Sequence, residues 1–163
     1  MPLENLSEAK LAFYNDSVIH FSAQISNLSA KGVNTTNMSL ILQGAQSQII
    51  TPFKLAIQGN TNSTQLWSAL NEYCLYDGCP VGLNYHLDAK INIAKLDAIT
   101  AKLRNVSNDT VDLNAAQASL NNASAELTKV GTAQYSGGAG VQIWTNIDSA
   151  VVSLHSAFNK LSK

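Results

Sequence analysis

The side chains that most often hold metals or perform acid–base chemistry are sparse in this chain. His20 follows Asp16 by four residues, a spacing that places both on one face of a helix. Imidazole and carboxylate groups together bind transition metals, so Asp16, His20 and His86 form a candidate metal site. The simpler interpretation is that each is a partly exposed polar residue beside an apolar stripe. The sequence has neither His-Glu-x-x-His nor the Glu-x-x-His of di-iron bundles, which argues against a dedicated metal site.

No other pattern indicates catalysis. The chain has no Gly-x-Ser-x-Gly elbow and no Cys-x-x-Cys pair. The glycine-rich segment 136–140, "SGGAG", lacks the Gly-Lys-Ser/Thr ending of a nucleotide-binding loop and follows no strand pattern. We therefore expect a protein that is not an enzyme and that needs no cofactor.

The two cysteines, Cys74 and Cys79, are separated by "LYDG". Asp-Gly at the centre favours a tight turn that brings the sulfurs together. A disulfide across so short a loop removes only about 2 kcal/mol of unfolded-state freedom, so it would pin a local turn. The alternative, a thiol pair that binds metal, lacks a second Cys/His pair at zinc-finger spacing. The sequence predicts the disulfide.

Acceptor motifs for N-glycosylation, Asn-x-Ser/Thr, are in excess. Random placement of 17 Asn and 27 Ser and Thr among 163 residues would give about three, and the chain has nine. This excess indicates a secreted glycoprotein. The alternative is that these residue types gather in helix-starting turns, but it does not account for Asn15 and Asn27, which lie inside a helical pattern. The acceptors are Asn5, Asn15, Asn27, Asn34, Asn37, Asn62, Asn105, Asn108 and Asn122.

Hydrophobic residues recur every three or four positions, which is typical of helices that pack together, and no segment alternates as a half-buried strand does. We predict one all-α domain, 1–163: an antiparallel helical bundle of four to five long helices, with one short helix over 63–75 and a disulfide-pinned loop. The clearest stripes are Leu11, Tyr14, Val18, Phe21, Ile25 and Leu28; Leu113, Ala116, Leu120, Ala123, Leu127 and Val130; and Trp144, Ile147, Val151, Leu154, Phe158 and Leu161.

The remaining helices are predicted over 36–58 and 87–103. The first has a stripe that Pro52 should kink or interrupt, because proline lacks an N–H group. Its stripe is Met38, Leu42, Ala45, Ile49, Phe53 and Ala56. Two connections, 73–86 and 131–140, are longer than a helix–helix link needs.

The turn "AKGVNTT" predicts a helix end with Gly32 in the left-handed conformation, followed by a cap from Thr35, Thr36 or Asn37. A similar phrase recurs about 71 residues later, at "AKLRNVSNDT". The recurrence indicates a duplicated helical hairpin, about 24–57 and 95–128. Convergent capping chemistry explains it almost equally well.

Aromatic side chains gather around the proposed disulfide loop. Tyr and Trp suit contacts with a partner or a carbohydrate, and long loops on a rigid bundle often carry binding residues. The alternative is a loop folded back as a lid on one end of the core. The candidate binding residues are Trp67, Tyr73, Tyr76 and Tyr85, with Tyr135 in the second long loop.

Charge is scarce: 13% of residues are charged, the net charge is −1, and 45% are hydrophobic. This composition has no basic patch for nucleic acid or an anionic membrane. No apolar run is long enough to span a bilayer. Met1-Pro2 is not followed by a signal peptide, so we expect either a cytosolic chain or a mature fragment, and the cysteines and acceptor motifs favour the mature fragment.

With few charges, many Asn, Gln, Ser and Thr residues, nine acceptor motifs and one cysteine pair, the chain resembles the N-glycosylated, secreted helical cell-surface proteins of acid-living archaea. "AKGVNTT" leading into an Ala/Leu/Gln-rich helix is also similar to helical repeats in exported archaeal proteins. The resemblance is one of composition and carries over no functional residue. It implies export, glycosylation and a position at the cell surface.

Three functions follow as hypotheses. The first is a glycosylated extracytoplasmic domain with a structural or recognition role, extracellular or at the cell surface. Its partner would be a cell-surface protein or glycan, or a second copy bound through helix faces. The second is a bundle that binds or senses a small molecule. The third and weakest is a metal-dependent enzyme that uses Asp16, His20 and His86.

Overall fold

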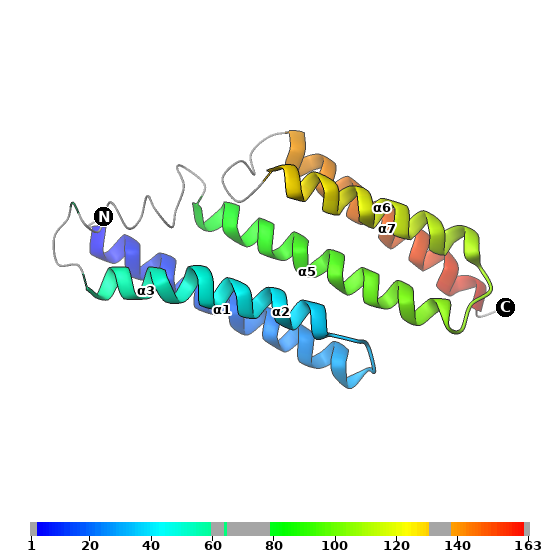
Figure 1. Ribbon diagram of the computed structural model, residues 1–163, viewed down its shortest axis with the longest axis horizontal. Helices are drawn as coiled ribbons and strands as arrows, with labels where there is room; N and C mark the ends of the chain where they lie inside the picture. Colours follow the sequence, from blue (N-terminus) through cyan, green and yellow to red (C-terminus); the bar gives the residue numbers. More distant parts are fainter. Residues whose placement is uncertain (1–2, 60–63, 65–78, 131–137, 162–163) are drawn as a thin grey trace.

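The computed structural model describes residues 3–59, 64, 79–130 and 138–161 (Figure 1). These residues form helices and no strand, which confirms the all-α bundle. The elements are α1 (Leu3–Ala30), α2 (Thr36–Ala45), the π-helical turn η1 (Gln46–Ile50), α3 (Thr51–Gln58), α5 (Cys79–Arg104), α6 (Thr110–Val130) and α7 (Gly138–Leu161). Because α2, η1 and α3 follow one another without a break, the described chain makes five long rods.

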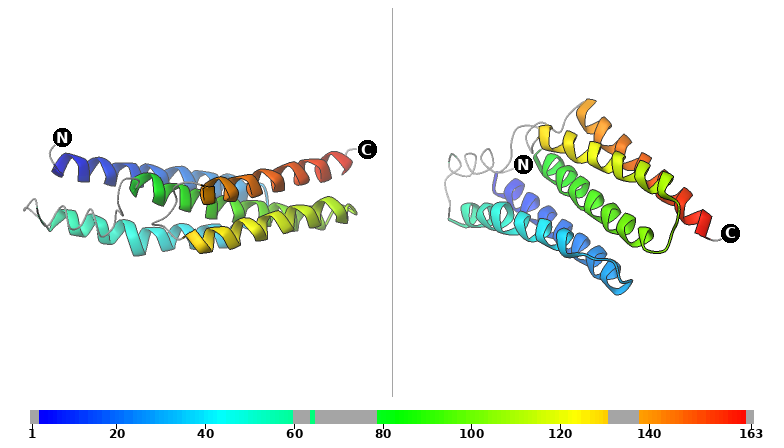
Figure 2. Two further views of the ribbon diagram at one scale, coloured as in Figure 1. Left: turned by 90° about the horizontal axis from the view of Figure 1, so that it is seen from above. Right: turned by 45° about the vertical axis from the view of Figure 1, so that its right-hand side comes forward.

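The central rod is α5 (Figures 1 and 2). On one side it packs on α1 and α2, and on the other it packs on α6 and α7. Its apolar residues therefore face two cores, which explains the unusually wide apolar face of this helix. Ala89, Ile93 and Leu96 enter the core shared with α6 and α7, while Leu87, Ile91 and Ala94 enter the core shared with α1 and α2.

The turn after α1 has the expected conformation. Gly32 has a φ of 71°, in the left-handed region that glycine adopts without strain. Its N–H group donates to the Ser29 oxygen at 2.9 Å, and the Val33 N–H group donates to the Leu28 oxygen at 3.1 Å. These two bonds form a Schellman motif, which satisfies carbonyl groups at the end of α1.

The cap of α2 differs from the prediction. Thr35 precedes the helix but makes no side-chain capping bond. Instead, Asn34 Oδ1 accepts a hydrogen bond from the Thr36 N–H group at 3.1 Å. An Asn side chain that accepts a hydrogen bond from the backbone N–H group two residues further on forms an Asx turn. The residue that initiates α2 therefore lies before the helix and not within it.

The predicted interruption near Pro52 takes the form of a π-helical turn. The Thr51 N–H group donates to the Gln46 oxygen, five residues back, one residue more than in an α-helix. The extra residue shifts the phase of the buried stripe: Ile50 is buried, whereas Ile49, expected in the stripe, is only half-buried. The absence of an N–H group on Pro52 is consistent with a break in the α-helical ladder at this point.

A third, small core forms where α1 meets η1 and α3. Its buried members among the described residues are Tyr14, Ile50 and Phe53. The rings of Tyr14 and Phe53 meet edge to face, with centroids 5.8 Å apart and planes at 73°. Burial raises the pKa of the Tyr14 hydroxyl to about 12.

The stripe predicted for α7 is correct only in part: Ile147 and Leu154 are buried and Trp144 packs against the same core, but the other three members are exposed. Val151, Phe158 and Leu161 are 46%, 57% and 40% exposed. The buried stripe is Ile143, Ile147, Ala150, Leu154 and Ala157, which packs on Leu113, Ala116, Leu120, Ala123 and Leu127 of α6. Ala150 and Ala157 let the two helix backbones approach closely, so alanines lie on the packed side of α7 beside its buried isoleucines and leucine. A pattern judged by side-chain size alone misses these alanines.

Two predicted connections are shorter than expected. α5 begins at Cys79, so the second half of segment 73–86 is helical. Pro80, its second residue, is tolerated because N–H groups in the first helical turn have no intrahelical partner. α7 likewise begins at Gly138, inside segment 131–140. The short helix over 63–75, apart from Thr64, and the proposed disulfide partner Cys74 lie outside the described residues.

The α1–α2 and α5–α6 connections share one local plan, a two-residue turn followed by three residues and then the next helix. Helix ends Ala30 and Arg104 correspond, as do helix starts Thr36 and Thr110, so equivalent positions are 74 residues apart. The sequence match gave about 71. The hairpin duplication over 24–57 and 95–128 stays a prediction.

No helix in the described part of the chain is both long enough and apolar enough to cross a bilayer.

Candidate functional site

A groove of about 530 Å³ runs between α2, α5 and α6. Helices far apart in the sequence build it, because α5 packs on α2 along one side and on α6 along the other. Its walls combine apolar side chains with hydroxyl, amide and charged groups. The lining residues are Asn37 and Ile41 from α2; His86, Lys90, Ile93, Ala94 and Asp97 from α5; and Ser124, Leu127 and Thr128 from α6.

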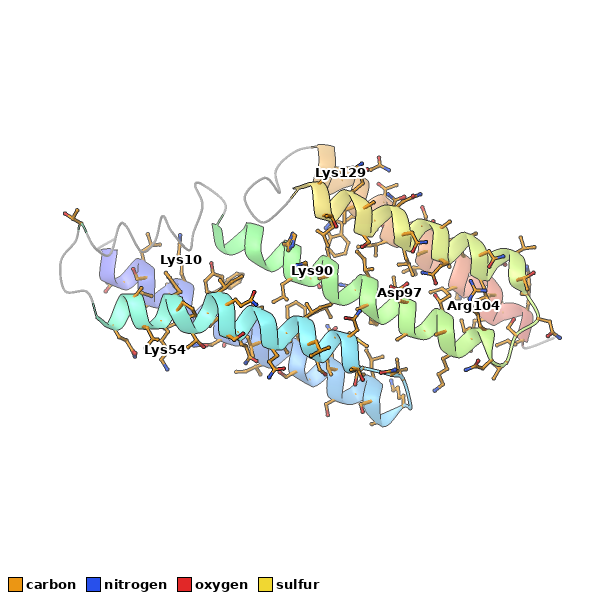
Figure 3. All side chains as sticks on the ribbon, in the orientation of Figure 1. Lys10, Lys54, Lys90, Asp97, Arg104 and Lys129 are labelled. Carbon is orange, nitrogen blue, oxygen red and sulfur yellow. The ribbon has the colours of Figure 1, made fainter. Side chains whose placement is uncertain are left out.

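His86 is the buried polar group of this groove, with 6% of its surface exposed. Burial lowers the pKa of its imidazole to about 4, and the positive charge of Lys90 contributes in the same direction. The ring is therefore neutral at neutral pH, with one nitrogen as donor and the other as acceptor. Lys90 lies four residues further along α5 and is exposed (Figure 3). The groove thus pairs a neutral imidazole with an ammonium group.

Asp97 places a carboxylate in the groove one heptad beyond Lys90 (Figure 3). Its Oδ1 accepts a hydrogen bond from Gln117 Nε2 at 2.9 Å, which ties α5 to α6. Gln117 Nε2 also donates to Asn121 Oδ1 at 3.3 Å. The carboxylate is therefore held in place by its neighbours. Positive and negative groups on one helix face suit a small polar ligand with an apolar body.

A second polar group lies where α5 faces α1. Burial raises the pKa of the Asp88 carboxyl, against the opposing charges of Lys95 and His20 and the hydrogen bond from Asn92 Nδ2 at 2.8 Å. Burial also lowers the pKa of the Lys95 ammonium, which the charge of Asp88 opposes. Gln24 Nε2 donates to His20 Nε2 at 2.8 Å. These hydrogen bonds and opposing charges form a polar seam between α5 and α1.

The structure does not assemble the candidate metal site. Asp16 and His20 are exposed on α1, and His86 is buried in the groove on α5. Among the residues that the structure describes, no three His, Cys, Asp or Glu side chains lie close enough to hold a metal ion.

A second and more open groove, about 680 Å³, separates α1 from α2. Hydroxyl and amide groups dominate its lining. They include Ser22, Ser26, Ser29, Thr35, Ser39, Gln43 and Gln46.

Eight of the nine acceptor asparagines lie within the described residues, and all eight are exposed. The ninth, Asn62, lies outside them. Among the asparagines outside any motif whose side chains the structure describes, Asn92 and Asn146 are half-buried. Asn37 also lines the groove between α2, α5 and α6, as does Ser124, the hydroxyl residue of the Asn122 motif. A glycan on Asn37 would stand at the mouth of that groove.

Most of the aromatic binding candidates fall outside the part of the chain that builds this groove. Trp67, Tyr73, Tyr76 and Tyr135 lie outside the described residues. Tyr85 belongs to α5, immediately before His86.

Sequence reasoning missed Lys90 and Asp97 as groove residues. Their spacing of seven residues was a signal for one helix face. The groove also needs α2 and α6, however, and no local pattern brings those helices to α5.

The chain matches no known protein-family model, no curated protein sequence and no solved structure.

Proposed function

We propose that this chain is a glycosylated helical domain outside the cytoplasm, with a structural or recognition role at the cell surface. The observation that carries the proposal is the exposure of every acceptor asparagine in the described residues. A glycan is large and hydrophilic, so a modified Asn must face solvent in the folded chain. Acceptor motifs that arose only by chance would include partly buried positions, as Asn92 and Asn146 are among the other asparagines.

The distribution of these motifs supports the same proposal. Three lie on α1, four lie in or beside the two short helix connections, and one lies on α6. The central helix α5 and the outer helix α7 contain asparagine but no acceptor motif. Glycans would then shield one part of the surface and leave α7 bare. We assign the domain no catalytic role.

Glycopeptide mass spectrometry on the protein from its native source tests this proposal. We expect sugar on several of the eight exposed acceptors: Asn5, Asn15, Asn27, Asn34, Asn37, Asn105, Asn108 and Asn122. Asn114, Asn121 and Asn159 are also exposed but lie outside any motif, so they are matched internal controls and should be unmodified. Bare asparagine at all eight acceptors would reject the proposal.

The groove between α2, α5 and α6 favours a second candidate function, the binding of a small molecule. The Lys90 ammonium beside apolar walls suits a carboxylate with an apolar body. Ser124→Trp would place an indole ring in the groove, because Ser124 is one of its lining residues. Ala118→Trp is the control, because it places the same ring on an exposed part of α6 that does not line the groove. In a panel of small apolar carboxylates, a hit should raise the Tm of the unmodified and Ala118→Trp proteins but not of Ser124→Trp. An equal rise in all three would reject the groove.

A further inference from the structure

The exposed apolar side chains of this protein are concentrated on α7. Eleven large hydrophobic residues are exposed in the described chain, and five of them belong to this one helix: Val141, Val151, Val152, Phe158 and Leu161. The other six are spread over α1, α2, α3, α6 and a connection: Phe13, Ile19, Leu40, Leu55, Val106 and Val111. Single exposed hydrophobic residues are ordinary, whereas a group on one helix marks a contact surface.

Most of these side chains share one face. Helix α7 runs along a margin of the molecule beside α6 (Figure 2). Residues three, four and seven apart lie on the same side of a helix. By this spacing the α7 face, as we call it, consists of eight exposed residues: Val141, Thr145, Asp148, Val151, Val152, His155, Phe158 and Asn159. Val141 and Val152 are 68% and 69% exposed.

The polar groups of the α7 face are self-complementary, because a carboxylate such as Asp148 accepts hydrogen bonds and an imidazole N–H group such as that of His155 donates them. Asp148 lies three residues before Val151, and His155 lies three residues after Val152. If two copies of α7 cross antiparallel, with the two-fold axis between Val151 and Val152, each Asp148 meets the His155 of the other copy. The same axis sets the valines of the two copies against each other. A parallel pairing would instead set Asp148 against Asp148, and like charges in contact repel.

Two further observations agree with this arrangement. Antiparallel helices also align their macrodipoles favourably. α7 carries no acceptor motif, so glycans would not obstruct the face. This last point alone rests on the proposed function. The rest holds for the bare chain.

We propose that the protein forms a two-fold symmetric dimer in which the α7 faces of two copies pack antiparallel. Val151 and Val152 lie at its centre, and two Asp148–His155 pairs flank them. Such an interface is isologous, because one patch meets itself and the assembly closes at two copies. The apolar centre provides the attraction, and the two Asp–His pairs fix the direction and register of the helices.

Sedimentation equilibrium on the full, unglycosylated chain tests the proposal separately from glycosylation. We expect a reversible monomer–dimer equilibrium. Val152→Glu should raise the dimer Kd about tenfold or more, because it brings two like charges to the centre of the interface. Val111→Glu is the matched control: Val111 is 74% exposed on α6, is not part of the α7 face, and should leave the Kd unchanged.

The two Asp–His pairs give the sharper test. Asp148→Lys and His155→Glu should each weaken the dimer, since the first sets two hydrogen-bond donors against one another and the second sets two carboxylates against one another. The double variant should restore it, because the introduced ammonium group of one copy would then face the introduced carboxylate of the other. These side chains are exposed, so the monomer fold should be unaffected, which circular dichroism checks. A chain that stays monomeric, a Val111→Glu effect equal to that of Val152→Glu, or a double variant as weak as the single ones would each overturn the proposal.

Discussion

The ammonium group of Lys102, on α5, donates a hydrogen bond to the carbonyl oxygen of Lys31 at 2.6 Å. The two residues are 71 positions apart. The bond fastens the central helix to the turn between α1 and α2, at the end where the first hairpin closes. It is a long-range polar tie between the two halves of a sparsely charged protein.

Removing this tie should weaken the first hairpin. We expect Lys102→Met to lower the free energy of unfolding by about 1 kcal/mol, the usual net value of one hydrogen bond. Lys129 pairs within its own helix, with Glu126 at 2.7 Å, and is 68% exposed. Lys129→Met should therefore change stability by less than about 0.5 kcal/mol. Urea denaturation of both variants checks the difference, and equal losses would contradict it.

Two glycines should respond to alanine with opposite signs. Gly32 has a positive φ, so Gly32→Ala forces a side chain into the left-handed region and should cost about 1–2 kcal/mol. Gly44 lies inside α2, and an added Cβ there would meet nothing within 4 Å. Gly44→Ala should therefore stabilise the protein by about 0.5–1 kcal/mol. Thermal and urea unfolding measure both. Two changes of the same sign would show that the turn is misassigned.

The close α6–α7 contact should reject larger side chains. Ala150 is fully buried against α6. Ala150→Leu should cost about 1–3 kcal/mol, since overpacking a dense core forces side chains off their rotamers. Ala115 is exposed on α6, so Ala115→Leu is the matched control and should be nearly neutral. A neutral Ala150→Leu would contradict this close packing. It would indicate that the predicted stripe with Val151 and Phe158 faces α6 instead.

His86 should make the protein less stable in acid. Its pKa is about 4 in the folded chain and 6.5 ordinarily, so the unfolded chain binds more protons between these values. The stability that the neutral ring contributes is fully present above pH 6.5 and is lost as the pH falls towards 4, at no more than about 1.4 kcal/mol per pH unit. His86→Phe should abolish this part of the slope.

The neighbouring Lys90 provides a control for His86. Its charge is one of the two causes that lower the pKa of His86. Lys90→Met should therefore raise the pKa of His86 in the folded chain. The pH range over which the protein loses stability would then be narrower, because its lower limit is higher. Denaturant titrations from about pH 3 to about pH 8 compare the three proteins. The raised pKa of Asp88 makes the free energy of unfolding depend on pH with the opposite sign. The contribution of His86 is therefore the slope of each protein minus the slope of His86→Phe. An unchanged slope in His86→Phe would show that other groups cause it.

His86, which is buried, and Asp88, which is half-buried, bear on adaptation to acid. Scarce charge protects a fold against protonation, and Asp88 gains its proton without loss because its pKa is raised. The neutral imidazole of His86 acts against this advantage, since it must accept a buried charge below about pH 4. A domain that works in strong acid would be more stable without it.

The far end of the bundle depends on Lys160. Its Nζ lies 2.7 Å from Asp109 Oδ2 and 2.8 Å from Asp112 Oδ2, which ties the last turn of α7 to the start of α6. The hydrogen bond from Lys160 is the first cause that lowers the pKa of the Asp112 carboxyl. The tie should therefore weaken as the pH falls through the lowered pKa of that group. Hydrogen exchange should be faster in the last turn of α7 in Lys160→Met. Lys160→Arg should retain protection, and equal exchange in both would refute the tie.

Much of the fold could be predicted because apolar spacing reports helices directly. The stripes of α1 and α6 are buried or half-buried where the structure describes them, and Gly32 ends its helix as expected. The failures share one cause: they depend on what packs against the helix. Ala150 is buried because α7 packs on α6, and Ile50 is buried because a π-helical turn shifts the phase. Neither effect has a local signature.

The candidate groove was less predictable than the helices. Sequence reasoning singled out His86, but as a metal ligand in a loop. Its burial and low pKa arise because α2 and α6 pack on either side of α5, which is a property of the topology.

The aromatic pair of Tyr14 and Phe53 has a consequence for how the protein moves. The described part of its core comes only from α1, η1 and α3, whereas α5 joins the other two cores. Val18 packs against both this core and the core that α1 and α2 share with α5, and so joins them. We expect the N-terminal half of α1 and the α3 end of its partner rod to open as one cooperative unit at this junction. The two helical segments of this unit should separate from the bundle and return to it at a lower free-energy cost than global unfolding, while α5, α6 and α7 stay folded.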